Sequence, residues 1–452
     1  MIKKSFRADN RRYNSTLPKF AFTVFFALFI SLFLTKVYSR ENTPVLTLEE
    51  CIKYALANNP TLQQAVSTVG INKAKTKEAG SDYLPTVSTT TSYAHASGSA
   101  GLATAGTIAT KGSAYLTQTT LEQLIWDFGQ TVNQIKLAKQ NLTTAQYAFL
   151  EAQGNTILNT KKAYFEVLKT QLLVDTASEN LSQAKVHFGK TKGFYEVGFK
   201  QKFDLTKEET NVSKANLDYV TAKKNYEVAK ASLNNIIGKI KDTNYKVEEI
   251  QEIKPIEANL SEAIIVATKN RNEILKKESE LKAAQTDLEI KKKGNWPTLS
   301  MDTSYGAKDS NTTSAVDSLN FGFLLKWPWF DSFKTQSQVE EAEENLKIAR
   351  ANFQEQTLDI ILEVQDAVFS LEEVEEKIKS SAKVLDESRQ NLEIINARYQ
   401  EGLSSVVEVN DAESALVSAK KNYVMALADY LMAQANYEKA VGIVGQSPRT
   451  NF

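Results

Sequence analysis

The sequence predicts a mixed, mainly α-helical fold in which long coiled-coil hairpins are joined to four β-strands per chain. Three observations support this class. The 452-residue chain contains an internal two-fold repeat, each half has about 65 residues with helical heptad spacing, and the residues before each such stretch alternate with a period of two. Heptad spacing over this length indicates a coiled coil, and a period of two indicates strands with one apolar face.

The internal repeat relates the two halves by an offset of 204 residues. The coiled-coil positions Ile135, Ala138, Leu142, Ala145 and Phe149 recur as Val339, Ala342, Leu346, Ala349 and Phe353. The same offset carries Asp127 onto Asp331 and Gly198 onto Gly402. Upstream, residues 84–88 match residues 296–300 at an offset of 212, so the first half holds eight extra residues between these anchors. We therefore expect two copies of one structural unit.

Residues 1–39 have the pattern of a secretory signal peptide. Several basic residues precede an apolar run from Phe20 to Leu34, and Ser39 is a small residue at the expected cleavage position. The alternative is an uncleaved anchor helix, but the apolar run of about 15 residues is shorter than the ~20 that span a bilayer. The sequence thus predicts an exported chain.

Composition excludes several classes of function. Beyond residue 39 the chain has 47 basic and 53 acidic residues, a balance that argues against nucleic-acid binding. The single cysteine, Cys51, excludes an internal disulfide framework and is interpreted as a small buried apolar residue. His95 and His187 are isolated in the sequence, so they form no metal-ligand or catalytic set. We expect neither an enzyme nor a bound cofactor.

Each repeat is predicted to contain the same elements in the same order. The first repeat, residues 40–250, has a helix, strands at about 84–95 and 114–126, a long helix at 131–195 and a helix at 200–238. The second repeat, residues 251–445, has a helix, strands at about 297–306 and 318–328, a long helix at 335–399 and a helix at 404–442, followed by a tail at 446–452. No proline lies between Pro85 and Pro255 or between Pro328 and Pro448, so uninterrupted helices of ~97 Å are permitted.

The predicted strands are amphipathic. In the second repeat, one face of the first strand has Leu299, Met301, Thr303 and Tyr305, and one face of the second strand has Leu319, Phe321, Phe323 and Leu325. Polar or small residues lie between them. The first repeat has the same pattern in a weaker form, with Val87, Thr89, Thr91 and Tyr93 on its first strand and Tyr115, Thr117, Thr119 and Leu121 on its second. Residues 96–112 and 308–317, rich in glycine, serine and threonine, are predicted to be surface loops. Strands of about ten residues have the length of transmembrane strands.

Four strands are too few to close a barrel by themselves, since ~8 is the practical minimum. Open strand edges are not tolerated in lipid, so the strands of several copies must share one barrel. Long helices that follow such strands in every copy would form a tube. The sequence therefore predicts an oligomer.

All four tryptophans fall at the ends of the predicted strands, next to the helices. They are Trp126, Trp296, Trp327 and Trp329. One interpretation is an aromatic girdle at the membrane interface. The other is packing at a corner between strand and helix, which is compatible with the first.

Two sets of residues resemble a known family. Residues 46–52 with Ala55-Leu56 and Asn59-Pro60 are similar to the start of TolC-like outer-membrane factors. So are Tyr195-x-x-Gly198 and Tyr399-x-x-Gly402, each followed six residues later by an acidic residue, Asp204 or Glu408. The resemblance covers about residues 44–445 in both repeats.

This resemblance implies a homotrimer in the outer membrane of a Gram-negative bacterium. Its 12-stranded barrel would lie in outer-membrane lipid, and its α-helical barrel would form a tunnel through the periplasm with a belt from about Lys239 to Asn259 and the C-terminal tail. The family provides a passive exit duct for tripartite efflux or type I secretion, together with an inner-membrane pump of the RND or ABC type. A periplasmic adaptor, or membrane fusion protein, would dock at the helix tips near Gly198, Gly402 and Tyr195.

The resemblance also implies a gate at the periplasmic tip. The family's inner carboxylate ring corresponds to Glu408 and Asp411, and its restraining contacts correspond to Tyr399 and Asp204. Three copies would place six carboxylates around a pore that favours cations. Ser404 stands where some members have a basic residue. The alternative for the three acidic residues is that they are solvated carboxylates in the first turns of helices.

A periplasmic coiled-coil adaptor or a structural protein of the cell envelope is the main alternative class. Such a protein would share the signal peptide and the heptads. It would not need duplicated amphipathic strand pairs of membrane-spanning length. An ordinary porin does not fit either the number of strands or the long helices.

Overall fold

The computed structural model describes residues 45–96, 112–238, 245–248, 256–310 and 313–443. The predicted signal peptide, the C-terminal tail and most of the predicted belt and first loop lie outside these residues. The chain divides into two compact units, residues 1–45 with 244–246 and residues 46–243 with 247–452, and the second unit is described below. Within the described ranges, none of the helices combines the length and the apolar character required to cross a membrane.

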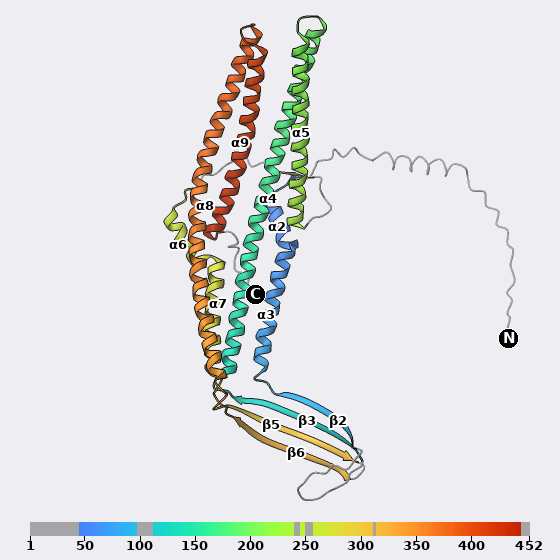
Figure 1. Cartoon of the computed structure of the whole chain (residues 1–452), viewed down its shortest axis with the longest axis vertical. Helices are drawn as coiled ribbons and strands as arrows, with labels where there is room; N and C mark the ends of the chain where they lie inside the picture. Colours follow the sequence, from blue (N-terminus) through green and yellow to red (C-terminus); the bar gives the residue numbers. More distant parts are fainter. Residues whose placement is uncertain (1–44, 97–111, 239–244, 249–255, 311–312, 444–452) are drawn as a thin grey trace, which may run out of the picture. The chain divides into compact units, whose positions relative to one another are not determined.

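Among its described residues the first repeat contains four helices, α2 (Leu48–Asn58), α3 (Pro60–Ser81), α4 (Gln130–Glu196) and α5 (Lys202–Ile237). Helix α2 begins with a capping box, in which the Glu50 N–H donates to the Thr47 hydroxyl oxygen and the Thr47 N–H donates to the Glu50 carboxylate. Helix α3 has Pro60 at its first position, where no backbone donor is needed, and Asn59 caps it. Helices α4 and α5 run side by side as a hairpin (Figure 1).

The second repeat has the same four helices, α6 (Leu260–Asn270), α7 (Asn272–Lys291), α8 (Lys334–Gln400) and α9 (Val406–Val441). Helices α4 and α8 both have 67 residues, and α5 and α9 both have 36. The chain is therefore mainly helical, as the sequence predicted. The sequence predicts one helix before the strands of each repeat, whereas in the structure this helix is divided in two at Asn59 and at Arg271.

The four long strands form one antiparallel sheet in the order β2 (Thr86–Ala96), β3 (Gly112–Trp126), β5 (Thr298–Ser310) and β6 (Thr313–Lys326). The register places Thr89 opposite Thr119 and Leu299 opposite Leu325. The predicted faces are confirmed, because Thr89 and Thr119 lie with their hydroxyl oxygens 3.0 Å apart. Strands β2 and β6 are the two edges of this sheet (Figure 1).

The prediction of a surface loop at residues 308–317 is wrong for most of this segment. Strand β5 continues to Ser310, and β6 begins at Thr313. The end of β5 pairs with β3, with Ser310 opposite Ala114. This pairing provides hydrogen-bond partners for the backbone of a segment whose composition is typical of a loop. Polar and small residues are compatible with a strand when neighbouring strands supply the pairing.

A second sheet consists of two short strands. Its strands are β1 (Val45–Leu46) and β4 (Lys246–Val247). The buried Tyr164 hydroxyl of α4 lies 3.1 Å from the Leu46 carbonyl oxygen and 3.2 Å from that of Glu248. These hydrogen bonds hold the Leu46 and Glu248 backbone against the middle of α4.

The helix contacts within the first repeat match those within the second, and two further helix contacts lie between the repeats. Helix α4 packs on α2, α3 and α5, and α8 packs on α6, α7 and α9. In addition, α4 packs on α7 and α9 of the second repeat, and this junction joins the two repeats. In the described part of the chain, α8 has no comparable contact with α3 or α5.

Candidate functional site

The turns from strand to helix are built alike in both repeats. Asp127 accepts hydrogen bonds from the Gly129 and Thr131 N–H groups, at 3.0 and 2.6 Å, and thereby caps α4. Asp331 accepts from the Thr335 N–H at 2.9 Å and from its hydroxyl at 2.6 Å, and thereby caps α8. These hydrogen bonds lower the pKa of Asp331. The repeated aspartates thus fix the point at which each long helix begins.

Trp126, Trp327 and Trp329 lie at or next to these turns, Trp296 lies between α7 and β5, and all four are exposed. Trp126 and Trp296 both contact the Phe128 ring edge to face, with ring centroids 6.0 and 5.2 Å from it. Trp327 and Trp329 lie at the end of β6 with most of their surfaces open. The packing interpretation therefore holds for Trp126 and Trp296, and the exposed surfaces of all four leave the membrane-girdle interpretation as a proposal.

The hairpin tips have the same backbone geometry in both repeats. Gly198 and Gly402 adopt left-handed conformations with φ of 82° and 75°. The Gly198 N–H donates to the Tyr195 carbonyl oxygen at 3.0 Å, and the Gly402 N–H donates to that of Tyr399 at 3.1 Å. A Cβ atom at either glycine would meet nothing within 4 Å, so conformation rather than space requires glycine here.

The predicted gate carboxylates lie just after these turns, at the start of the return helices. Glu408 accepts hydrogen bonds from the Ser404 hydroxyl at 2.7 Å and the Ser405 hydroxyl at 3.3 Å, and these bonds lower its pKa. Asp411 follows one turn later and is exposed. The hydrogen bond from Ser404 therefore holds the Glu408 side chain at the N-terminus of α9.

Asp204 occupies the equivalent position in the first repeat, where it accepts from the Gln201 N–H at 3.3 Å. The structure contains no hydrogen bond between Asp204 and Tyr399, which are both among its described residues. The geometry therefore accounts for Glu408 and Asp204 as helix-capping residues. Their part in a gate remains a proposal about the assembled protein.

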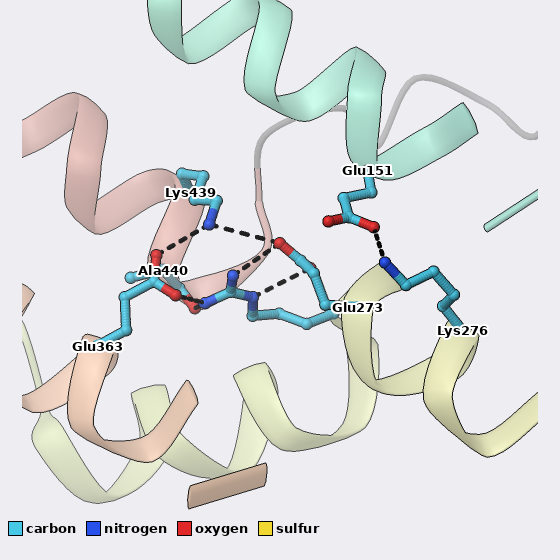
Figure 2. Close-up of polar contacts among 7 residues, drawn as sticks. Glu151, Glu273, Lys276, Glu363, Lys439 and Ala440 are labelled. Atoms are coloured by element: carbon cyan, nitrogen blue, oxygen red, sulfur yellow. Dashed lines mark hydrogen bonds and ion pairs between the residues drawn. The ribbon is translucent and has the colours of Figure 1, made fainter. Parts of the chain in front are cut away.

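An extensive polar cluster that the sequence does not predict lies where α6, α7, α8 and α9 meet. Arg271, at the break between α6 and α7, donates to Glu273 at 2.7 Å, to Glu363 at 2.5 Å and to the Ala440 carbonyl oxygen at 3.4 Å. Figure 2 shows Glu273 and Glu363 converging with Lys439 from separate helices. A separate ion pair joins Lys276 to Glu151 of α4.

The electrostatics of this cluster keep its groups charged. Burial alone would raise the pKa of Glu273, but the hydrogen bonds and charge of Arg271 outweigh it and lower the pKa to about 2. The pKa of Glu363 is also lowered, because hydrogen bonds to Lys439 and Arg271 outweigh the effect of burial. The cluster is fully paired and can act as a structural brace rather than as an acid or base. The sign of this cluster in the sequence is that Arg271, Glu273, Glu363 and Lys439 are all charged residues.

A second missed contact joins the two hairpins near their tips. His187 of α4 lies 2.8 Å from a carboxylate oxygen of Glu413 on α9. His187 is isolated in the sequence, because its partner is 226 residues away along the chain. No sequence spacing could have indicated this pair.

The chain matches the family model for outer membrane efflux proteins over residues 51–239 and 264–443. Among curated proteins it is 23% identical over 416 residues to the outer membrane protein TolC of Salmonella enteritidis, which covers 88% of this chain and 82% of that relative. It is 22% identical over 386 residues to nodulation protein T of Rhizobium leguminosarum bv. viciae, covering 84% of this chain and 79% of that relative.

Solved structures show the same fold. The CmeC outer membrane channel of Campylobacter jejuni superposes with a TM-score of 0.79 at 18% identity, covering 89% of this chain and 87% of that one. The outer membrane protein VceC of Vibrio cholerae superposes with a TM-score of 0.76 at 17% identity, covering 87% and 96%.

Proposed function

The chain belongs to the outer membrane efflux protein family, and we propose that it forms, as a homotrimer, the passive exit duct of a tripartite efflux or type I secretion system. It is an outer membrane protein that extends into the periplasm. The alternative of a periplasmic adaptor does not account for the family match or for the four-stranded sheet.

The observation that supports an assembly is the unequal burial of equivalent residues in the two repeats. Phe165 of α4 is 5% exposed, whereas its equivalent Phe369 of α8 is 57% exposed. Each helix has the same neighbours within its own repeat, so the difference comes from α7 and α9, which pack on α4 as well as on α8, whereas α3 and α5 pack on α4 but not comparably on α8. The α8 face is therefore an edge without a partner in the single chain.

The opposite edge of the chain is unpartnered in the same way. Val424 of α9 is 9% exposed and its equivalent Val220 of α5 is 54% exposed. Ala283 of α7 is 9% exposed and its equivalent Ile71 of α3 is 55% exposed. If α8 of one copy packed on α3 and α5 of the next copy, this contact would repeat the one that α4 makes with α7 and α9 within a chain. Such a head-to-tail interface closes into a ring when the rotation between successive copies is a whole fraction of a turn, which is one third of a turn for the proposed trimer.

The sheet supports the same assembly. Strands β2 and β6 are unpaired edges, and β6 exposes a row of apolar side chains, namely Leu319, Phe321, Phe323 and Leu325. Pairing β6 of one copy with β2 of the next would satisfy both edges. Three copies would supply twelve strands, the number that the resemblance implies. The apolar row would then face lipid.

The remaining parts of the proposal concern the tips. Three copies would bring Glu408 and Asp411 together around the tunnel end, with Tyr399 and Asp204 beside them. A periplasmic adaptor would dock on the turns at Tyr195, Gly198 and Gly402, and an inner-membrane pump would supply the energy. No catalytic step is assigned to this chain.

The test of the assembly uses purified protein in detergent and in planar lipid bilayers. Wild-type protein is expected to have the mass of a trimer and to conduct ions. Phe369→Asp places a charge on the proposed interface and should abolish the trimer. Val186→Asp is the matched control, because Val186 and its equivalent Gln390 are both exposed and lie outside the proposed interface. A trimeric Phe369→Asp variant would contradict the proposed interface.

The test of the carboxylate ring uses the same bilayers. Glu408→Gln combined with Asp411→Asn should lower the preference for cations by about threefold or more. Glu401→Gln, a nearby exposed carboxylate, is the control and should leave the preference unchanged. If the double variant conducts with wild-type selectivity, the two residues are solvated carboxylates outside the pore.

A further inference from the structure

Helix α7 ends in a run of lysines just before the sheet begins. The last two, Lys292 and Lys293, form the basic patch considered below. The Lys293 ammonium lies 3.4 Å from the Gly129 carbonyl oxygen, at the turn that precedes α4. The Lys292 ammonium lies 3.8 Å from the Glu289 carboxylate, and both of these side chains are exposed, so the ion pair is weak. The patch therefore has ammonium groups that remain accessible to an anion.

An aromatic cluster of Trp126, Phe128 and Trp296 lies directly beside the basic patch. The Trp296 N–H donates to the Lys293 carbonyl oxygen at 3.0 Å, which fixes the two residues within one turn. The rings of both tryptophans contact the Phe128 ring. Phe128 has a φ of 54°, a left-handed conformation that is costly for an aromatic residue, and yet it is 39% exposed. One corner of the chain thus combines exposed aromatic surface with two ammonium groups.

One explanation of the lysines is that they stabilise the end of α7, because basic side chains favour the negative end of a helix dipole. The first repeat argues against it. Helix α3 has Gly80 and Ser81 where α7 has Lys292 and Lys293, and its last turn contains no basic residue. In addition, the backbone N–H groups of residues 292–294 already donate to carbonyl oxygens in the last turn of α7. Helix capping therefore does not account for the basic patch.

The aromatic cluster would place this corner at the membrane surface. Trp126 lies opposite Leu299, which belongs with Met301 to the apolar face of β5. In an outer membrane protein that extends into the periplasm, the strand ends next to the helices would lie at the periplasmic leaflet. Phospholipid phosphates lie at the same level of a membrane as interfacial tryptophans. The ammonium groups of the basic patch are then at the depth of these phosphates.

We propose that each chain binds one anionic phospholipid of the periplasmic leaflet at this corner. The phosphate pairs with the ammonium groups of Lys292 and Lys293, and the first acyl carbons pack on the aromatic cluster. This inference rests on the proposed function, because it requires the strands to lie in the outer membrane. A headgroup with a net negative charge is favoured, since the lysines repel the ammonium group of a zwitterionic headgroup such as phosphatidylethanolamine.

The equivalent corner of the first repeat does not offer a second site. Asp82 follows Gly80 and Ser81 there, and its carboxylate would repel a phosphate. Leu84 stands at the position of Trp296. Each chain therefore has one lipid site, and the proposed trimer has three.

Lys326 provides a matched control at the same end of the sheet. It lies opposite Thr298 at the end of β6 and follows Leu325, which belongs to the apolar row of that strand. Because side chains alternate along a strand, Lys326 lies on the polar face of the sheet. In the proposed barrel this face points to the interior, away from lipid.

Brominated lipids test the site through its own tryptophans. In a Trp327→Phe and Trp329→Phe background, the remaining tryptophan fluorescence comes from Trp126 and Trp296. The trimer is reconstituted into phosphatidylcholine vesicles with increasing fractions of brominated phosphatidylglycerol or brominated phosphatidylethanolamine. Half-maximal quenching should require about tenfold less phosphatidylglycerol than phosphatidylethanolamine. Equal quenching by the two lipids would overturn the inference.

Variants of the basic patch then identify the groups that hold the phosphate. Lys292→Gln combined with Lys293→Gln should raise the fraction of phosphatidylglycerol at half-maximal quenching about tenfold. Lys292→Arg combined with Lys293→Arg keeps both charges and should retain the wild-type value, as should the control Lys326→Gln. If the double glutamine variant is quenched as readily as the wild type, the lysines do not hold the phosphate and the proposal is wrong.

Two measurements need no change in the basic patch. Raising the salt concentration should reduce the preference for phosphatidylglycerol, because the charges of the patch are exposed and therefore screened. A preference that does not respond to salt would contradict an ionic site. Inorganic phosphate should not compete with the lipid, since it has no acyl chain to pack on the aromatic cluster. Competition by inorganic phosphate at the concentration of the lipid would show a site for free anions instead.

The two proposals fail in different ways. Wild-type protein that neither forms a trimer nor conducts would contradict the proposed function. A conducting trimer that is quenched equally by the two brominated lipids would contradict only the inference about the lipid site.

Discussion

The two repeats fix the end of their last helix by the same backbone contact but with different side chains. The Asn59 amide donates to the Ile236 carbonyl oxygen at 3.3 Å, and the Arg271 guanidinium donates to the equivalent Ala440 carbonyl oxygen at 3.4 Å. The residues around them have diverged together, because Thr61, Asn159 and Asn235 in the first repeat correspond to Glu273, Glu363 and Lys439 in the second. Both repeats have the contact to the backbone, but its surroundings are neutral in the first repeat and charged in the second.

The surroundings also differ in how open they are. Asn59, Thr61 and Asn159 line a groove of about 740 Å³, whereas the cavity beside Arg271 measures about 20 Å³. Because the setting of the charged cluster is closed, its charges are stable only when every one of them is paired. Neutral amides tolerate water and can remain in an open groove. The comparison therefore predicts that substitutions in the second repeat have larger effects.

The largest expected effect is that of Arg271→Met. Removing the guanidinium leaves Glu273 and Glu363 with only Lys439, which should lower the free energy of unfolding by about 3–5 kcal/mol. Asn59→Ala, the matched change in the first repeat, removes one neutral hydrogen bond and should cost about 1 kcal/mol. Guanidinium-induced unfolding in detergent, followed by circular dichroism, measures both. Equal losses would show that the charged cluster contributes no more than the neutral one.

Acid should destabilise the second repeat in a defined pH window. The pKa of Glu273 is lowered to about 2, so its contribution is fully present above the pKa of an unfolded glutamate, about 4.5, and is lost as the pH falls toward 2. The free energy of unfolding should fall by about 3 kcal/mol across this window. Glu273→Gln should remove most of this pH dependence, and Thr61→Gln at the equivalent position of the first repeat should leave it intact.

The glycines that end α5 and α9 should respond unequally to alanine. Gly238 and Gly442 both adopt left-handed conformations, with φ of 71° and 82°. A Cβ at Gly238 would lie 2.8 Å from the Asn58 Cβ atom, whereas at Gly442 its nearest contact is the flexible Arg271 Cγ atom at 3.2 Å. Gly238→Ala should therefore cost about 2 kcal/mol and Gly442→Ala about 1 kcal/mol. A larger loss for Gly442→Ala would contradict this assignment.

The smallest expected effect is at the caps of the long helices. Asp127 is buried and caps α4 with two backbone hydrogen bonds, so Asp127→Ala should cost about 1 kcal/mol in thermal unfolding. Asp331 caps α8 at a more open position, and its replacement by alanine should cost less. If both changes had no effect, the caps would only mark the helix starts and would not stabilise them.

Features that depend on local spacing were predictable from the sequence. The heptads predicted the mainly helical fold, and the period of two predicted the faces of the strands that pair Thr89 with Thr119. Gly198 and Gly402 were expected at helix ends and adopt the left-handed conformation that closes them. Each of these features is set by residues within one or two turns, which a sequence pattern records directly.

Features that depend on distant partners were not predictable. The break at Arg271 is stabilised by Glu363 and Ala440, which lie 92 and 169 residues away. The strand at residues 313–317 depends on pairing with β5, and His187 finds its partner across the junction of the repeats. Of the candidate site, the sequence indicated the tip turns and the capping carboxylates but missed both charged contacts that join helices.

By itself the sequence determined the duplicated unit, the length of its helices and the alternation of its strands, because covalent spacing fixes the periodicity of each element. The tertiary structure decided which member of each pair of equivalent residues is buried. Phe165 and Phe369 are the same residue in the same local setting, and only the packing of α7 and α9 on α4 makes one buried and the other exposed. That asymmetry arises from contacts between repeats, which no pattern within a single repeat contains.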